Sequence, residues 1–310
     1  MTPGQRIFFN EVVTRDGFQN EAQFVATDDK VALVDALSAC GYAKIEVTSF
    51  TSPKAIPMLR DADEVMGRIH RLPGVEYTVL VPNRRGAERA AEARADEWNL
   101  VMSVSETHNR ANLRMSRLAS FAALREVVRA AEGQAAVNVS LSCSFGCPME
   151  GEVPVAGLLR WAQAFADLGV RGLTLCDTTG MAHPAQVAQL ADLLQAALPA
   201  LPQLTMHFHD TRGMGLANVL AAVQAGIVRL DGSLGGLGGC PYAPGASGNI
   251  SSEDTLHMLD AMGYATGVDL ATLLQVARAL PGIVGHAVPG QVAKAGRIGD
   301  LHPAPAGLLP

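Results

Sequence analysis

The sequence predicts an α/β fold, a closed (β/α)8 barrel (TIM barrel) with a short C-terminal extension. Eight β-rich runs recur along the 310 residues, amphipathic Ala/Leu-rich stretches separate them, and no break in composition divides the chain. An open doubly wound sheet is the alternative fold. We therefore expect one catalytic barrel over residues 1–280. The Pro- and Gly-containing tail over residues 281–310 is expected to pack on the barrel or to be partly flexible.

The predicted strands are short runs rich in β-branched and apolar residues. In chain order they are Arg6–Val13, Lys44–Thr48, Glu76–Val81, Asn99–Val104, Ala136–Leu141, Gly172–Cys176, Gln203–His209 and Ile227–Asp231. The stretches between them predict helices, since apolar residues return there at three- and four-residue spacing. Asp28–Cys40 and Pro184–Leu198 are examples, each with Asp or Pro near its start.

Composition excludes several classes of protein. A formal net charge of −6 without a basic block argues against a nucleic-acid partner. No apolar run reaches the roughly 18 residues of a membrane span, and the first residues lack a signal sequence, so we expect no membrane partner and a cytoplasmic location. Five cysteines, an odd number, argue against a disulfide framework.

Polar groups gather where the predicted strands end, and the carboxyl ends of barrel strands carry the active site in such enzymes. Arg15 and Asp16 follow the first strand, and Glu46 closes the second. Asp177 follows the sixth strand. His207 and His209 end the seventh, and residues 240–249 lie beyond the eighth.

A metal site is predicted at this end of the barrel. His207 and His209 are two residues apart on a strand, so both side chains point to the same face, here the interior. Asp16 could add a carboxylate oxygen and Asn249 an amide oxygen. Such ligands, completed by water or substrate, suit Mg2+ or Mn2+, with Zn2+ less favoured.

Three further residues are candidates for the chemistry itself. Arg15 could stabilise an oxyanion, or it could form a structural salt bridge. Glu46 is costly to bury unpaired, so it is expected to bind Arg15, a metal-bound water or substrate. Cys240 stands in a Gly-rich loop without the Lys-Ser/Thr of a Walker motif, and it is either an acid–base group or a small buried side chain.

Four motifs run in one order across nearly the whole chain: RDGFQNE (15–21), IEVTSFTSPK (45–54), HFHDTRGMGLAN (207–218) and GGLGGCPYAPGASGN (235–249). With them the sequence resembles the 3-hydroxy-3-methylglutaryl-CoA (HMG-CoA) lyases of the DRE-TIM metallolyase superfamily. The resemblance implies the (β/α)8 barrel and the site residues on it. It places Asp16, His207, His209 and Asn249 at the metal and Arg15, Glu46 and Cys240 near the reacting atoms.

The resemblance also implies the reaction, a retro-Claisen cleavage of an acyl-CoA substrate to acetyl-CoA and a keto acid, here acetoacetate. The metal would acidify the substrate hydroxyl, Arg15 would balance charge on the thioester oxygen, and Cys240 would protonate the enolate carbon. The hydroxyl base stays open among Asp16, His207 and a metal-bound water. Arg15, Gln19 and Asp177 are the candidate substrate-binding residues.

Several positions depart from the lyase pattern. Val13-Thr14 replace the usual Gly-Pro, Ala22 replaces a Lys, and Arg212 replaces a Tyr, while residues 105–116 look more like the related synthases. These departures keep citramalyl-CoA or another 3-hydroxy-3-alkyl acyl-CoA as an alternative substrate. A 2-isopropylmalate- or homocitrate-type synthase is a further alternative, and an idle barrel with a binding role is the last. A homodimer or higher homo-oligomer is expected from the resemblance.

Overall fold

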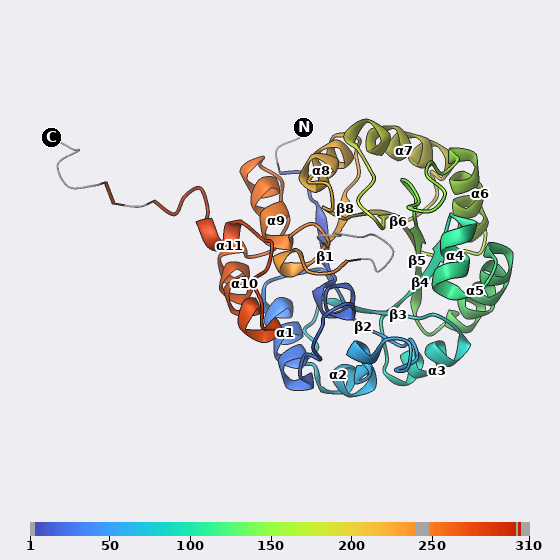
Figure 1. The fold of residues 1–310 in the computed structure, drawn as a ribbon, viewed down its shortest axis with the longest axis horizontal. Helices are drawn as coiled ribbons and strands as arrows, with labels where there is room; N and C mark the ends of the chain where they lie inside the picture. The colour runs from blue at the N-terminus through green and yellow to red at the C-terminus, as the bar shows by residue number, and fades with distance from the viewer. Residues whose placement is uncertain (1–3, 240–247, 302, 305–310) are drawn as a thin grey trace.

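The computed structural model describes residues 4–239, 248–301 and 303–304. Within them, eight parallel strands close into a barrel in sequence order, as the sequence predicts (Figure 1). The strands are β1 Phe8–Glu11, β2 Lys44–Ser49, β3 Glu76–Leu80, β4 Glu97–Ser103, β5 Ala136–Ser142, β6 Gly172–Asp177, β7 Gln203–Phe208 and β8 Arg229–Gly232.

Pairing of the first strand with the last decides between the two candidate folds. β1 pairs in parallel with β2 on one side and with β8 on the other, with Phe8 opposite Arg229 and Glu11 opposite Gly232. An open doubly wound sheet would leave its edge strands unpaired. The closed barrel is therefore confirmed.

The predicted first strand is too long. Arg6 makes only an isolated bridge to Ala265, and the chain leaves the extended conformation after Glu11. The Glu11 carboxylate accepts hydrogen bonds from the backbone N–H groups of Val12 (3.0 Å) and Val13 (2.9 Å). The next residues wind into a single π-helical turn, η1 (Val13–Gly17), at the carboxyl end of β1.

Helices surround the barrel and cover the outer faces of its strands (Figure 1). They are α1 Thr27–Ala39, α2 Ala62–Arg68, α3 Arg84–Glu92, α4 Glu106–Leu113, α5 Arg117–Ala131, α6 Val155–Ala166, α7 Pro184–Ala197, α8 Gly215–Gln224, α9 Ser252–Ala261, α10 Leu270–Val284 and α11 Val292–Ala295. Two short 3-10 turns, η2 Pro57–Leu59 and η3 Leu234–Gly236, lie in loops. The predicted helices at residues 28–40 and 184–198 are confirmed as α1 and α7.

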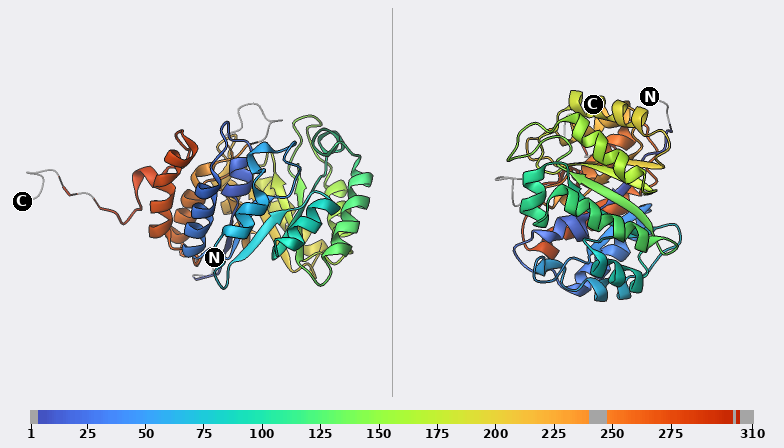
Figure 2. Two further views of the ribbon diagram at one scale, coloured as in Figure 1. Left: turned by 90° about the horizontal axis from the view of Figure 1, so that it is seen from below. Right: turned by 90° about the vertical axis from the view of Figure 1, so that its right-hand side faces the viewer.

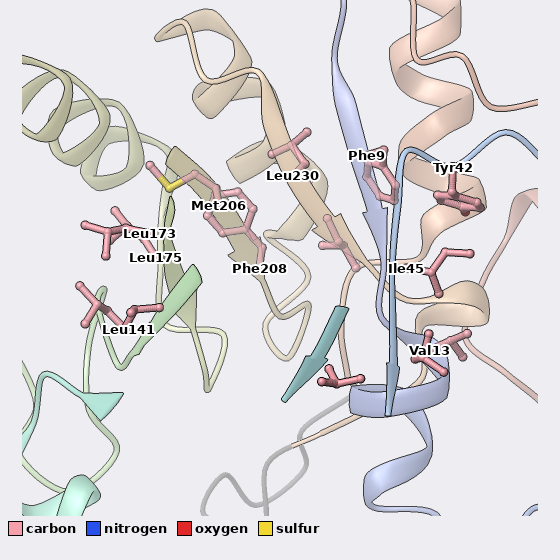
Figure 3. Close-up of a cluster of buried hydrophobic side chains, with 14 of the residues drawn as sticks. Phe9, Val13, Tyr42, Ile45, Leu141, Leu173, Leu175, Met206, Phe208 and Leu230 are labelled. Carbon is pink, nitrogen blue, oxygen red and sulfur yellow. The ribbon is translucent and has the colours of Figure 1, made fainter. Parts of the chain in front are cut away.

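The apolar core lies between the strands and the helices (Figure 3). Along β7, Met206 and Phe208 are fully buried and belong to this core. Side chains alternate along a strand, so His207 and His209 point to the opposite face, which is the barrel interior. The prediction that both imidazoles face inward is confirmed by this alternation and by their mutual contact.

The amino-terminal end of the barrel is closed by charged side chains that pair with one another. Lys44 Nζ lies 2.6 Å from Glu97 Oε1, and Arg171 lies 2.6 Å from Glu76 and also binds Glu97. Glu97 is almost fully buried, so its charge depends on these two cations. Access to the interior is thus left to the carboxyl end.

The C-terminal residues continue from the barrel without a break. Helix α10 passes residue 280, the boundary expected from the sequence, and ends at Val284. The Asp254 carboxylate accepts the N–H groups of Gln291 (2.9 Å) and Val292 (2.6 Å) and so joins α11 to α9. The chain then runs away from the barrel (Figures 1 and 2). Among the described residues, no helix has both the length and the apolarity to span a bilayer.

Candidate active site

The turn η1 brings Arg15 and Asp16 to the mouth of the barrel. Both residues are about nine-tenths buried. Arg15 Nε donates to Glu46 Oε2 at 2.6 Å, and Arg15 Nη1 donates to the Asp16 carboxylate. The other Glu46 oxygen accepts a hydrogen bond of 2.8 Å from Asn99 on β4. Residues from η1, β2 and β4 are therefore joined in one buried network.

The oppositely charged groups of this network shift one another's pKa values in the direction that favours their ionised forms. Burial alone would lower the pKa of Arg15, but the carboxylates of Asp16 and Glu46 outweigh burial and raise that pKa above its usual value. Burial raises the pKa of Glu46, although Arg15 and the Asn99 hydrogen bond oppose the shift. The guanidinium is permanently charged and is fixed by a carboxylate on each side.

Asp16, His207 and His209 converge on one point. The Nε2 atoms of the two imidazoles lie 3.2 Å apart. Asp16 Oδ2 lies 3.8 Å from His207 Nε2 and 3.9 Å from His209 Nε2. One ligand atom from each residue falls within 4.8 Å of the others, an arrangement that could hold a metal ion.

Metal ligands bind as carboxylate and neutral imidazole, and the ionisation of Asp16 and His209 suits this, whereas His207 has to release a proton more readily held than usual. Burial would raise the pKa of Asp16, but the charges of Arg15, His207 and His209 outweigh burial and hold it well below its usual value. Burial and the neighbouring His207 lower the pKa of His209 to about 4. Burial would lower the pKa of His207 too, but Asp231 and Asp16 raise it.

Asn249 completes the cluster from the far end of the chain. Its Nδ2 donates to Asp16 Oδ2 (2.8 Å) and to the carbonyl of Leu237 (2.9 Å). Its Oδ1 is buried and has no hydrogen-bond partner within the described part of the chain. A buried amide oxygen without a partner is costly. The residues therefore fit a divalent cation, with two imidazole nitrogens, one carboxylate oxygen and this amide oxygen as donors.

Asp231 on β8 supports one of the ligands from behind. Its Oδ2 lies 3.3 Å from His207 Nδ1, and its Oδ1 accepts a hydrogen bond of 2.8 Å from Asn10. A carboxylate that accepts a hydrogen bond from Nδ1–H keeps the ring proton on Nδ1 and leaves Nε2 free to bind a metal.

The candidate substrate-binding residues are placed differently. Asp177 is buried at the end of β6, where Oδ1 accepts the N–H groups of Met181 (2.7 Å) and Ala182 (3.1 Å). Its Oδ2 is buried without a partner among the described residues, and burial raises the pKa of Asp177 to about 6. Gln19 is half-buried just after η1.

Cys240 lies outside the described residues. The preceding carbonyl, that of Gly239, accepts a hydrogen bond of 2.7 Å from Asn20 Nδ2. The first described stretch of the Gly-rich loop therefore ends beside the residues that follow η1.

Comparison with known proteins agrees with this geometry. Residues 6–280 match the model of the family described as HMGL-like. The chain belongs to the HMGL-like family. The match runs from before β1 into α10 and includes Asp16, His207, His209 and Asn249.

Relatives in this family match the chain over most of its length. Hydroxymethylglutaryl-CoA lyase YngG of Bacillus subtilis is 45% identical over 288 residues, covering 93% of this chain and 96% of the relative. The mitochondrial hydroxymethylglutaryl-CoA lyase of Homo sapiens is 38% identical over 294 residues, covering 94% and 90%. A solved HMG-CoA lyase from Acenitobacter baumannii, in complex with coenzyme A and 3-methylmalate, is 48% identical with a TM-score of 0.93, covering 97% and 98%.

Two contacts at the HMGL-like site were not anticipated from the sequence. Asp231 appears in the sequence only as the last residue of a predicted strand, and Asn99 only as the first residue of another. Asp231 is the better signal, because an acidic residue inside a short barrel strand is costly to bury without a partner. No sequence pattern around Asn99 indicates that this side chain binds Glu46.

Proposed function

We propose that this chain is a divalent-metal-dependent carbon–carbon lyase that cleaves 3-hydroxy-3-methylglutaryl-CoA to acetyl-CoA and acetoacetate. The observation that carries the proposal is the convergence of Asp16, His207 and His209 beside a paired Arg15, in a chain of the HMGL-like family. The named relatives are hydroxymethylglutaryl-CoA lyases, and one was solved with coenzyme A.

We assign the metal site to Asp16, His207, His209 and Asn249, with Mg2+ or Mn2+ as the ion and Zn2+ less favoured. Carboxylate and amide oxygens suit these harder ions. When bound, the cation supplies a Lewis acid that makes the substrate hydroxyl more acidic. Asp16 contributes a negative charge to the site, because its pKa lies well below its usual value beside Arg15 and the two imidazoles.

Arg15 is assigned to the thioester oxygen of the substrate. Its Nε and Nη1 are held by Glu46 and Asp16, and its Nη2 makes no hydrogen bond within the described residues. A donor fixed in advance stabilises an oxyanion without reorganisation as the charge develops. Glu46 positions Arg15 in this scheme, and Asn99 positions Glu46.

The bond that breaks joins the hydroxyl-bearing carbon to the carbon next to the thioester. The hydroxyl proton passes to a base, for which Asp16 and His207 are the candidate residues. The hydroxyl-bearing carbon then becomes the ketone of acetoacetate, and the electrons of the broken carbon–carbon bond pass to the acetyl-CoA enolate. Cys240 is assigned as the acid that returns a proton to the enolate carbon. The remaining substrate contacts are assigned to Gln19 and Asp177.

The test is release of acetyl-CoA from 3-hydroxy-3-methylglutaryl-CoA and from citramalyl-CoA in parallel, with Mg2+ or Mn2+ and again with EDTA. Metal-dependent cleavage of the first thioester alone supports the proposal. Cleavage of citramalyl-CoA alone would support the proposed bond cleavage but would show that citramalyl-CoA is the substrate. Condensation of acetyl-CoA with a keto acid would indicate a synthase. Purified protein without metal and without turnover would indicate a binding role.

A second acyl group is favoured by one observation. The Acenitobacter baumannii relative was solved with 3-methylmalate, a diacid one carbon shorter in its backbone than 3-hydroxy-3-methylglutarate. The same metal cluster could bind the hydroxyl of either acid. 3-Methylmalyl-CoA therefore belongs in the substrate panel, with propionyl-CoA and glyoxylate as the products to be measured.

We also propose that the protein forms a homodimer or a higher homo-oligomer. Ile298 and Leu301 lie on the segment that runs away from the barrel and are 75% and 88% exposed. Exposed apolar side chains that cluster together mark contacts with other chains, and the proposal is that a second chain covers these two. Light scattering of the full chain and of Leu301→Ser tests this, since a monomer at micromolar concentration in the unmodified chain would contradict it.

A further inference from the structure

The loop after β7 places an arginine at the mouth of the barrel, three residues beyond His209. Arg212 is exposed, and its Nη1 donates to the carbonyls of Thr179 (2.9 Å) and Gly180 (2.8 Å) on the loop after β6. Two bonds from one nitrogen fix the guanidinium over that loop. Its Nε and Nη2 make no hydrogen bond within the described residues, so they remain available as donors.

The two loops are packed closely enough to hold this position. Gly180 has a φ of +61°, and a Cβ at Gly180 would lie 2.7 Å from Thr211 Cβ. A larger residue at Gly180 would separate the loops. Arg212 therefore lies where the loops after β6 and β7 pack closely against each other.

The guanidinium of Arg212 is not held in an ion pair. Among the described residues, no carboxylate oxygen lies within ion-pair distance of its guanidinium. Arg15, the other guanidinium near the metal cluster, is paired with both Asp16 and Glu46. An anion that approaches the site thus meets, at Arg212, a guanidinium that no carboxylate of the described residues binds directly.

Asp177 connects Arg212 to the metal cluster. Asp177 lies opposite Phe208 in the pairing of β6 with β7, so it is beside the strand positions of His207 and His209. Arg212 in turn binds the carbonyl of Thr179, two residues after Asp177. A ligand that extends from the metal cluster along the mouth of the barrel would pass Asp177 and reach Arg212.

We infer that Arg212 binds an anionic group of the substrate, either the carboxylate of the acyl chain or a phosphate of coenzyme A. Arginine suits both, because its planar fork of donors matches the spacing of two anionic oxygens. The inference rests on the proposed function for the identity of the substrate. The chain carries a net charge of −6, so a fixed cation at the site also offsets the general repulsion of an anionic ligand.

The kinetic test compares Arg212→Gln and Arg212→Lys with the wild-type enzyme over a range of 3-hydroxy-3-methylglutaryl-CoA concentrations. Loss of a charged hydrogen bond to a bound anion predicts that Arg212→Gln raises KM about tenfold. Its kcat should stay within about twofold, because the group binds substrate away from the reacting atoms. Arg212→Lys keeps the charge and should restore part of the loss. Arg84→Gln, an exposed arginine on α3, is the matched control.

Two outcomes would overturn the inference. One is an Arg212→Gln enzyme with the KM of the wild type. The other is a loss of kcat and of melting temperature at unchanged KM, which would mean that Arg212 only holds the two loops together.

Calorimetry separates the two anions and does not depend on turnover. The wild type and Arg212→Gln are titrated, in the presence of Mg2+, with coenzyme A and separately with 3-hydroxy-3-methylglutarate. Weaker binding of coenzyme A alone assigns Arg212 to a phosphate, and weaker binding of the diacid alone assigns it to the carboxylate. Equal binding of both by the two proteins overturns the inference. A wild type that binds but cleaves no thioester would contradict the lyase function and leave the binding result intact.

Discussion

The Nε2 atoms of His207 and His209 lie 3.2 Å apart, and both imidazoles are buried. Two ring nitrogens at this distance either share a proton or face a common cation. Burial and His207 lower the pKa of His209 to about 4, so His209 is neutral near pH 7. The pair is therefore ready to bind a metal without first losing a proton from His209.

Replacing His209 by alanine should remove most of the metal and most of the activity. One of four expected ligands is lost, and the buried space left behind cannot supply another. We expect turnover to fall by more than about 100-fold. Metal content by mass spectrometry and acetyl-CoA release are the measurements. His70→Ala, at an exposed position after α2, is the control. Full metal content in His209→Ala would remove this residue from the ligand set.

Asp231→Asn should weaken metal binding without removing a ligand. The carboxylate lies 3.3 Å from His207 Nδ1 and fixes the ring so that Nε2 faces the cluster. An amide can offer either a donor or an acceptor to Nδ1, so the tautomer is no longer imposed. We expect metal affinity to fall by about 10- to 100-fold, measured by competition with a chelator. An unchanged affinity would mean that the ring is held by its other contacts.

Much of this site can be predicted from short-range patterns. The inward direction of His207 and His209 follows from their spacing of two on a strand. The meeting of the polar residues follows from the eight β-rich runs, because a closed parallel barrel places the carboxyl ends of all its strands at one mouth. Asp16 and His207 therefore meet although they are 191 positions apart in the chain.

Other parts of the site depend on contacts that no local pattern records. The first strand reads as continuous to Val13, yet the Glu11 side chain binds the N–H groups of Val12 and Val13 and turns the chain into η1. That turn directs Asp16 toward the histidines. The hydrogen bond from Asn99 to Glu46 joins two strands that are not adjacent in the barrel, so it depends on how side chains fill the interior.

The stability of the metal-free protein should depend on Asp177 between about pH 4 and pH 7. Burial raises its pKa from 3.8 to about 6, so the folded protein binds a proton there more tightly than the unfolded chain. The stabilisation by protonated Asp177 is complete below the unfolded pKa and is lost as pH rises through about 6. A shift of this size corresponds to about 3 kcal/mol of unfolding free energy.

Asp177→Asn should remove this pH dependence. The measurement is the melting temperature of each protein in EDTA at pH 4 and at pH 7. Relative to the wild type, Asp177→Asn should gain stability on going from the lower to the higher pH. Asp192→Asn, at an exposed position on α7, provides the control. Parallel pH profiles for the wild type and Asp177→Asn would show that Asp177 does not change its ionisation on folding in this range.

Glu46→Gln should reduce kcat more than it changes KM. The amide keeps the size of the side chain and can still accept from Arg15 Nε, but it removes one of the two charges that fix the guanidinium. Loss of an oriented oxyanion donor typically costs about 100-fold in kcat, which is the decrease we expect at most. Metal content should be retained, because Glu46 is not among the proposed ligands. If metal is lost together with activity, Glu46 acts through Asp16 and the cluster, and its assignment to positioning Arg15 is wrong.

Cys240→Ser should separate proton transfer from metal binding. A serine hydroxyl is similar in size but is a much weaker acid than a thiol, so it should return a proton to the enolate carbon far more slowly. We expect turnover to fall by about 100-fold or more, while metal content and the calorimetric affinity for coenzyme A stay at the wild-type level. Cys143→Ser, at a buried cysteine after β5, is a comparison for the general effect of losing a thiol. A Cys240→Ser enzyme with wild-type kcat would remove Cys240 from the mechanism, and the proton would then have to come from another group at the mouth of the barrel.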